Sequence, residues 1–150
     1  RAVLTLGKAL EPEFREYGAQ VMRNAKALAQ GLLDAGGELI TGGTDNHMMV
    51  LDTVKSFGLD GRVAEESLDE ISITTNKQII PDDPNPPLRP SGIRIGTPAA
   101  TARGMKETEM ARLAGWIVAG LKQREDAAAV AKLRAEVEQF CRGFPVPGLE

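Results

Sequence analysis

Arg94 is the residue whose type and spacing best suit chemistry. Ile93 and Ile95 lie on either side of it, so in a strand both isoleucines would face the core and Arg94 would face the opposite side. Gly92 and Gly96 stand two positions before and after Arg94 and let a ligand or another backbone come close. A planar guanidinium on a rigid strand can grip a carboxylate or phosphate through two parallel hydrogen bonds.

A helix start is expected directly after this strand. Thr97 is typical of an N-cap and Pro98 of a first helical residue. The N-terminus of a helix favours anions, which strengthens the interpretation of Arg94 as an anion holder. The alternative is a structural ion pair at the edge of a sheet, and position alone leaves both interpretations open.

A proline-rich loop precedes the strand of Arg94, with prolines at 81, 84, 86, 87 and 90. Composition favours a rigid connector. The functional alternative is a preorganised wall, because prolines lower the entropy cost of holding Asn76, Lys77 and Gln78 in place.

The other reactive side chains point to no catalytic or metal site. His47 is the only histidine, and we expect its imidazole to be packed or bonded within its own turn. Cys141 lies far from it in sequence, so the two residues predict neither a metal site nor a Cys-His dyad, and Cys141 is expected in the core. Lys77 follows threonines, which raises a Schiff-base interpretation, but we expect a solvated lysine at the end of a strand.

Composition predicts one soluble globular domain of 150 residues. With 21 acidic and 18 basic residues the net charge is -3, and aromatic residues make up only 4%. These values argue against a nucleic-acid surface or a base-stacking platform. We find no signal peptide and no apolar run long enough for a bilayer. A single cysteine excludes an internal disulfide and suits a reducing compartment.

Hydrophobic periodicity predicts the elements that position these residues. The run His47–Asp52 hardly alternates, which predicts a central strand covered on both faces. The order predicts an α+β two-layer sandwich with a small, mainly antiparallel sheet and helices on one face. Positions 149–150 could be cloning residues. Helices are expected over 1–10 (a truncated linker helix), from Pro12 to Gly36, after Asp60-Gly61, and over about 97–104, 106–123 and 126–141; strands are expected over Glu38–Thr41, His47–Asp52, Ile71–Thr75 and around Arg94.

Three stretches, in this order and spacing, form a specific pattern. They are the helical stretch from Glu11 to Leu28, the run Gly42-Gly43-Thr44-Asp45-Asn46-His47, and the run from Ser91 to Ala99 that contains Arg94. Together they resemble the C-terminal small domain of serine hydroxymethyltransferase, a fold-type-I pyridoxal-phosphate enzyme. Family members convert serine and tetrahydrofolate to glycine and 5,10-methylenetetrahydrofolate.

The resemblance implies specific roles. Arg94 would bind the carboxylate of the amino-acid substrate, and Asn76 and Gln78 would lie beside the folate, although the family commonly has Asn at position 78. The cofactor lysine of the family occurs in a threonine-rich His-Lys context that is absent here, so we expect the chain alone to be inactive and to hold no catalytic residue. Its partners would be its own large N-terminal domain and further copies of the enzyme. We expect a cytoplasmic location and no binding to nucleic acid or membrane.

Two other interpretations stay open at this point. One is the small domain of another fold-type-I enzyme, such as an aminotransferase. The other is a non-catalytic domain that binds amino acids or another protein. A domain cut from its partner should also expose an apolar patch, on residues 1–10 or the first long helix, and self-associate.

Overall fold

A four-stranded antiparallel sheet in the order β1-β2-β4-β3 is the scaffold of the chain in the computed structural model, which describes residues 6–148. β2 and β4 are the central strands, as expected for the apolar run before Asp52. The strands are β1 (Glu38–Leu39), β2 (Met48–Asp52), β3 (Asn76–Gln78) and β4 (Gly92–Gly96).

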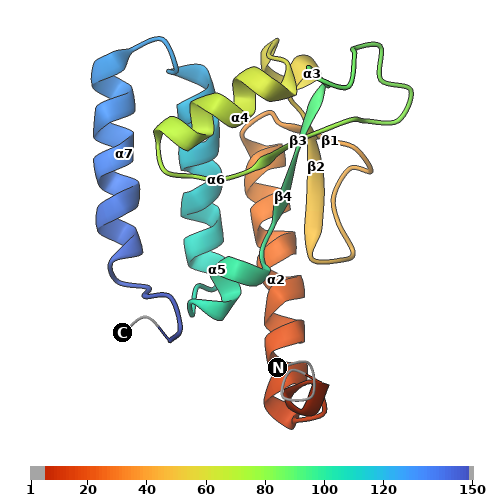
Figure 1. The fold of residues 1–150 in the computed structure, drawn as a ribbon, viewed down its shortest axis with the longest axis vertical. Coiled ribbons are helices and arrows are strands. Elements are labelled where there is room, and N and C mark those ends of the chain that lie inside the picture. Colours follow the sequence, from red (N-terminus) through yellow and green to blue (C-terminus); the bar gives the residue numbers. More distant parts are fainter. Residues whose placement is uncertain (1–5, 149–150) are drawn as a thin grey trace.

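Helices pack along one side of this sheet, which confirms the α+β sandwich (Figure 1). α2 and α6 lie side by side, and α7 packs on α6 (Figure 1). The helices are α2 (Pro12–Asp34), α3 (Thr53–Phe57), α4 (Gly61–Glu70), α5 (Pro98–Ala102), α6 (Glu107–Lys122) and α7 (Ala127–Cys141). Within residues 6–148, no helix has both the length and the apolar character that crossing a membrane requires.

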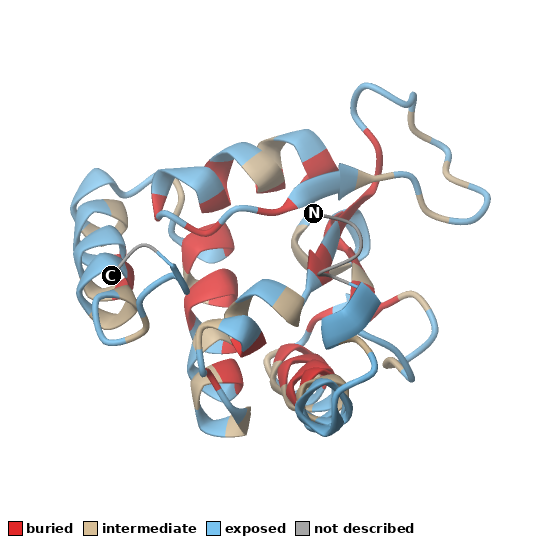
Figure 2. Ribbon diagram, turned by 60° about the horizontal axis from the view of Figure 1, so that its bottom comes forward, coloured by how far each residue is buried: buried red, intermediate tan, exposed pale blue. Residues whose placement is uncertain are grey.

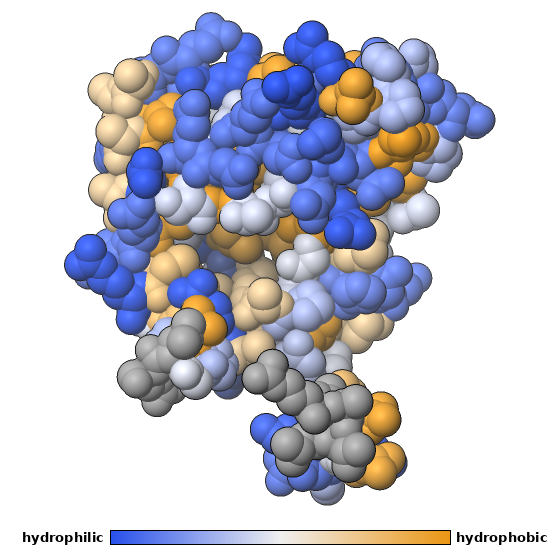
Figure 3. Space-filling model, in the orientation of Figure 1, coloured by the Kyte–Doolittle hydropathy of each residue, from blue (hydrophilic) through white to orange (hydrophobic). Residues whose placement is uncertain are grey.

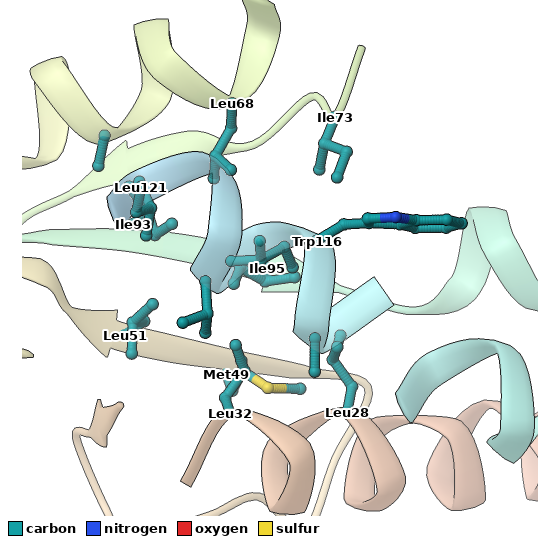
Figure 4. Close-up of a cluster of buried hydrophobic side chains, with 14 of the residues drawn as sticks. Leu28, Leu32, Met49, Leu51, Leu68, Ile73, Ile93, Ile95, Trp116 and Leu121 are labelled. Carbon is teal, nitrogen blue, oxygen red and sulfur yellow. The ribbon is translucent and has the colours of Figure 1, made fainter. Parts of the chain in front are cut away.

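The core lies between the sheet and the two long helices (Figure 4). Leu28 and Leu32 are four residues apart on α2 and therefore share one face of that helix, and both are fully buried. Each such leucine contributes about 1.5–3 kcal/mol by leaving water. Opposite them lie buried side chains of β2 and β4: Met49, Leu51, Ile93 and Ile95 (Figure 4).

The second face of the sheet is less covered than expected. On β2, Met49 and Leu51 are buried, whereas Met48 and Val50 are only half-buried. Hydropathy does not alternate along β2, so the sequence could not show that only one face is packed. Val50 pairs with Arg94, and this open face is therefore the one that carries the candidate site.

The prediction of a strand over Ile71–Thr75 is wrong, because strand pairing begins only at Asn76. Ser72 has a left-handed φ of 62°, and the Ile73 N–H donates to the Leu68 carbonyl at 2.9 Å, so the segment closes the end of α4 instead of joining the sheet. Ile71 and Ile73 are buried, so the alternating isoleucines serve the core from an irregular segment.

Asp60 and Gly61 begin α4 beside the last residue of the proline loop, since the Gly61 N–H donates to the Pro90 carbonyl at 2.6 Å. The Asp60 carboxylate caps the helix by accepting from the Val63 N–H at 3.0 Å, as expected. A Cβ at position 61 would lie 2.1 Å from the Gly92 carbonyl oxygen, so only glycine permits this close approach between α4 and β4. The start of the Arg94 strand is thereby held in place.

The N-terminal end of α2 projects from the rest of the molecule (Figure 1). Residues 11–16 are exposed along the whole first part of this helix (Figure 2). Of the expected helix over 1–10, the described part Leu6–Lys8 is helical, while residues 1–5, like 149–150, lie outside the described residues.

Candidate functional site

Arg94 lies on the open face of β4, as the alternation predicts. Ile93 and Ile95 are buried at 0% and 6% exposure, whereas Arg94 is exposed. The strand is central and hydrogen-bonded on both sides, to β2 and to β3. The guanidinium therefore stands on a rigid support.

The strand register places Val50, Arg94 and Asn76 in one row across three neighbouring strands. Directly paired residues of antiparallel strands have their side chains on the same face. The Arg94 Nη2 donates to the Asn76 Oδ1 at 3.3 Å, which is a long hydrogen bond to a neutral amide. The charge of Arg94 is oriented by this contact but not neutralised.

A depression of about 430 Å³ opens beside Arg94. None of the ion pairs among residues 6–148 includes Arg94, so no described carboxylate competes for its guanidinium. An uncompensated, exposed arginine in a depression is suited to bind an anion from outside the chain. The Arg94 depression is lined by His47, Met48, Thr74, Thr75, Asn76, Arg94, Gly96, Pro98 and Ala99.

Thr97 anchors the end of β4 to α2. Its N–H donates to the His47 carbonyl at 3.0 Å, and its hydroxyl donates to the Val21 carbonyl at 3.0 Å. Thr97 is the N-cap residue of α5, as predicted, but its hydroxyl is used for this contact with α2 and does not bond the first turn of α5. Pro98 is the first residue of α5, as predicted, and its carbonyl accepts from the Tyr17 hydroxyl at 3.1 Å.

A buried amide extends this anchoring, and the sequence analysis missed it. Asn24 is 0% exposed, and its Nδ2 donates to the Thr101 Oγ1 at 2.8 Å and to the Met105 carbonyl at 2.9 Å. A signal existed in the sequence, because Asn24 lies on the apolar stripe of α2, three residues after Val21 and four before Leu28. The network joins α2 to α5, directly after the Arg94 strand.

Gln78 lies two residues beyond Asn76 on the same face of β3 and does not line the Arg94 depression. Its Nε2 donates to the Ile79 carbonyl at 3.1 Å. The structure thus brings Asn76, but not Gln78, to Arg94.

Lys77 is engaged in a pair with Glu65 on α4. Its Nζ lies 2.9 Å from the Glu65 Oε2, and its N–H donates to the other carboxylate oxygen at 3.1 Å. The hydrogen bond from the Lys77 side chain lowers the pKa of Glu65 against the opposing effect of burial. Lys77 is therefore the middle residue of β3 and ion-paired, and not the solvated lysine at a strand end that was expected.

His47 contributes to the rim of the Arg94 depression, whereas Cys141 does not line it. The His47 side chain is exposed at the rim of the depression rather than packed, while its carbonyl receives the bond from Thr97. Cys141 is half-buried at the edge of the core. Among residues 6–148 no group of three or more His, Cys, Asp or Glu side chains is placed to hold a metal ion.

The proline loop is organised around Asp83. Its carboxylate accepts from the Ser91 hydroxyl at 2.6 Å and N–H at 2.9 Å, and from the N–H groups of Asn85 at 2.9 Å and Ile80 at 3.2 Å. Burial alone would raise the pKa of Asp83, but these hydrogen bonds outweigh burial and lower the pKa to about 2. The loop is therefore a fixed structure that leads into β4.

Comparisons with known proteins agree on one family. A sequence model described as serine hydroxymethyltransferase matches residues 1–117. A serine hydroxymethyltransferase of Koribacter versatilis is 48% identical over 139 residues, which cover 93% of this chain and 32% of that protein. Those of Alkalilimnicola ehrlichii and Acidobacterium capsulatum are each 48% identical, covering 93% and 94% of this chain and 33% of each relative. The chain thus spans about a third of the length of the curated relatives it matches.

Proposed function

The chain belongs to the serine hydroxymethyltransferase family, and we propose that it is the C-terminal small domain of a longer enzyme of this kind. In this proposal the whole enzyme interconverts serine and tetrahydrofolate with glycine and 5,10-methylenetetrahydrofolate. The chain would supply one side of the substrate site and would be inactive alone. Its span of about a third of its relatives supports this division.

The observation that carries the proposal is the uncompensated guanidinium of Arg94 on the open face of a central strand. Arg94 would bind the carboxylate of serine or glycine through two parallel N–H···O bonds. Such a clamp fixes the orientation of the amino acid, and therefore contributes to the rate as well as to affinity. Asn76 would hold the guanidinium toward β3 until the carboxylate arrives.

The described residues fit the substrate side of a pyridoxal-phosphate site and not the attachment of the cofactor. Lys77 is already bound by Glu65, and the Arg94 depression is lined by no lysine. When bound, pyridoxal phosphate supplies an electron sink for bond breaking next to the amino group. We propose that the lysine and the phosphate-binding groups belong to the large N-terminal domain, and that this chain contributes the carboxylate anchor.

Folate contact is proposed for Gln78 first and for Asn76 second. Gln78 is half-buried on the open face of β3, and its amide can donate and accept. Asn76 already has its amide oxygen at Arg94, which makes a simultaneous folate contact less favourable. We further propose that the enzyme is a cytoplasmic homo-oligomer, which light scattering and cell fractionation would check.

The test is a chimeric enzyme in which this chain replaces the matching 139-residue segment of the Koribacter versatilis relative. Arg94→Lys should raise KM for serine about 10- to 100-fold, because a lysine cannot form the two-pronged contact. Arg62→Lys is the matched control, since Arg62 is an exposed arginine of α4 that pairs with Glu66 on its own helix. An active chimera in which both variants behave alike would rule out the assigned role of Arg94.

Two further measurements test the role of Gln78 and the binding of amino acids by the isolated chain. Gln78→Ala should raise KM for tetrahydrofolate and leave KM for serine unchanged. Calorimetric titration of the isolated chain with glycine or serine should detect only weak binding, because one side of a site lacks the rest of the contacts. Tight binding by the isolated chain would instead favour a non-catalytic amino-acid-binding domain.

A further inference from the structure

Gly96 has no structural reason to be glycine within the described chain. A Cβ at this position would lie 3.5 Å from the His47 carbonyl oxygen, 3.6 Å from the Pro98 Cδ and 3.8 Å from the Met48 Cβ, which are ordinary contacts. Its φ lies outside the left-handed region, and it pairs with Met48 as a regular strand residue. Glycine inside a strand costs stability relative to residues with side chains.

Gly92 on the same strand provides the contrast. A Cβ there would lie 2.8 Å from the Ile80 Cγ2 and 3.0 Å from the Leu51 carbonyl oxygen, so the fold itself requires this glycine. The two positions that flank Arg94 are therefore glycine for different reasons. Gly92 makes room for the chain, whereas the space at Gly96 is left open.

This open space belongs to the Arg94 depression. Gly96 is exposed and lines it together with Arg94. Residues two positions apart on a strand point to the same face, about 7 Å from each other. A side chain at position 96 would thus project into the depression beside the guanidinium, where the remaining atoms of a carboxylate-bound molecule must lie.

We propose that Gly96 is the position at which the amino acid held by Arg94 comes into van der Waals contact with the sheet. The absence of a side chain here keeps the space beside the carboxylate anchor open, and the backbone of Gly96 forms the wall that the amino acid contacts. This inference rests on the proposed function of Arg94. It adds a residue that determines specificity through its backbone alone.

The experiment uses the same chimeric enzyme with Gly96→Ala and the larger Gly96→Val. Gly96→Ala should leave the melting temperature unchanged or higher, because no described atom beyond its two chain neighbours is closer than 3.5 Å to the new methyl group. Its kcat/KM for serine should fall roughly 10-fold, since one extra carbon in a fitted pocket changes discrimination by about 10- to 200-fold. Gly96→Val should lower kcat/KM further.

Gly115→Ala is the matched control, because Gly115 is exposed on α6 and a Cβ there has nothing within 4 Å. Equal activity of Gly96→Ala and Gly115→Ala would overturn the inference. A lower melting temperature or a lost oligomer in Gly96→Ala would also overturn it, because the space would then be filled by polypeptide and not by ligand. If Arg94→Lys also leaves the kinetics for serine unchanged, the proposed function itself fails. If Arg94→Lys raises KM for serine while Gly96→Ala changes nothing, only the role of Gly96 is refuted.

Discussion

Arg94 and Asn76 face each other across β4 and β3, and the Arg94 Nη2 donates to the Asn76 Oδ1 at 3.3 Å. A neutral amide oxygen can orient a guanidinium without cancelling its charge. One long hydrogen bond also leaves the other N–H groups of the fork free for a ligand. The pair therefore keeps Arg94 directed and available.

Asn76→Asp should make the Arg94 guanidinium less available to the substrate carboxylate. The new carboxylate would stand directly opposite Arg94 and form a cross-strand ion pair. Because this carboxylate belongs to the same chain, its effective concentration at Arg94 is high, and it competes with the substrate carboxylate. In the chimeric enzyme we expect KM for serine to rise about 10-fold or more. Gln123→Glu makes a comparable charge change at an exposed position after α6 and should leave KM unchanged. An Asn76→Asp enzyme with unchanged KM would show that Arg94 does not bind the substrate carboxylate.

The sequence was sufficient to predict the orientation of Arg94. Two isoleucines flanking an arginine indicate which side chain faces the core, because side chains alternate along a regularly paired strand such as β4. The same reasoning failed for Ile71–Thr75. There the alternating isoleucines are buried from an irregular segment, since Ser72 adopts a left-handed φ and the chain bonds the end of α4.

Contacts between distant segments were beyond the reach of sequence patterns. Thr97 stands where a cap is expected, but its hydroxyl bonds Val21, which is 76 positions away. Asn24 interrupts an apolar stripe, yet only the packing of α2 against α5 reveals its partner Thr101. Local preference identifies the residue types, and tertiary contacts decide how their polar atoms are used.

The proline loop should respond to acid at unusually low pH. Asp83 has its pKa lowered from 3.8 to about 2, so its ionised form stabilises the loop fully above the ordinary pKa of the carboxyl. That stabilisation is lost as pH falls from about 4 toward about 2. An NMR titration of the Ser91 amide should therefore show its transition near pH 2.

Asp83→Asn tests the cause of this transition. An amide has one acceptor oxygen, so it cannot accept all four hydrogen bonds that reach the carboxylate. The Ser91 amide should then exchange faster at neutral pH and show no step near pH 2. Asp45→Asn, at an exposed turn, should leave the wild-type transition in place. A Ser91 transition near pH 4 in the wild-type chain would contradict the hydrogen-bonded Asp83.

The projecting end of α2 should make the isolated chain self-associate. Leu6 and Leu10, which precede α2, are 69% and 85% exposed, and Phe14 in the first turn of α2 is 47% exposed. Figure 3 shows hydrophobic atoms at this projecting end. Apolar side chains gathered on a projecting helix end mark a surface that is normally covered. In the proposed enzyme the rest of the polypeptide would cover it, and in the isolated chain a second copy is the available substitute.

Size-exclusion chromatography with light scattering over a concentration series measures this association. The wild-type chain should shift toward a dimer as concentration rises, and the double variant Leu10→Gln, Phe14→Gln should remain monomeric with an unchanged melting temperature. Leu88→Gln is the matched control, because Leu88 is 77% exposed but lies in the proline loop, away from α2. A wild-type chain that stays monomeric throughout would show that these side chains are tolerated in water and mark no covered surface.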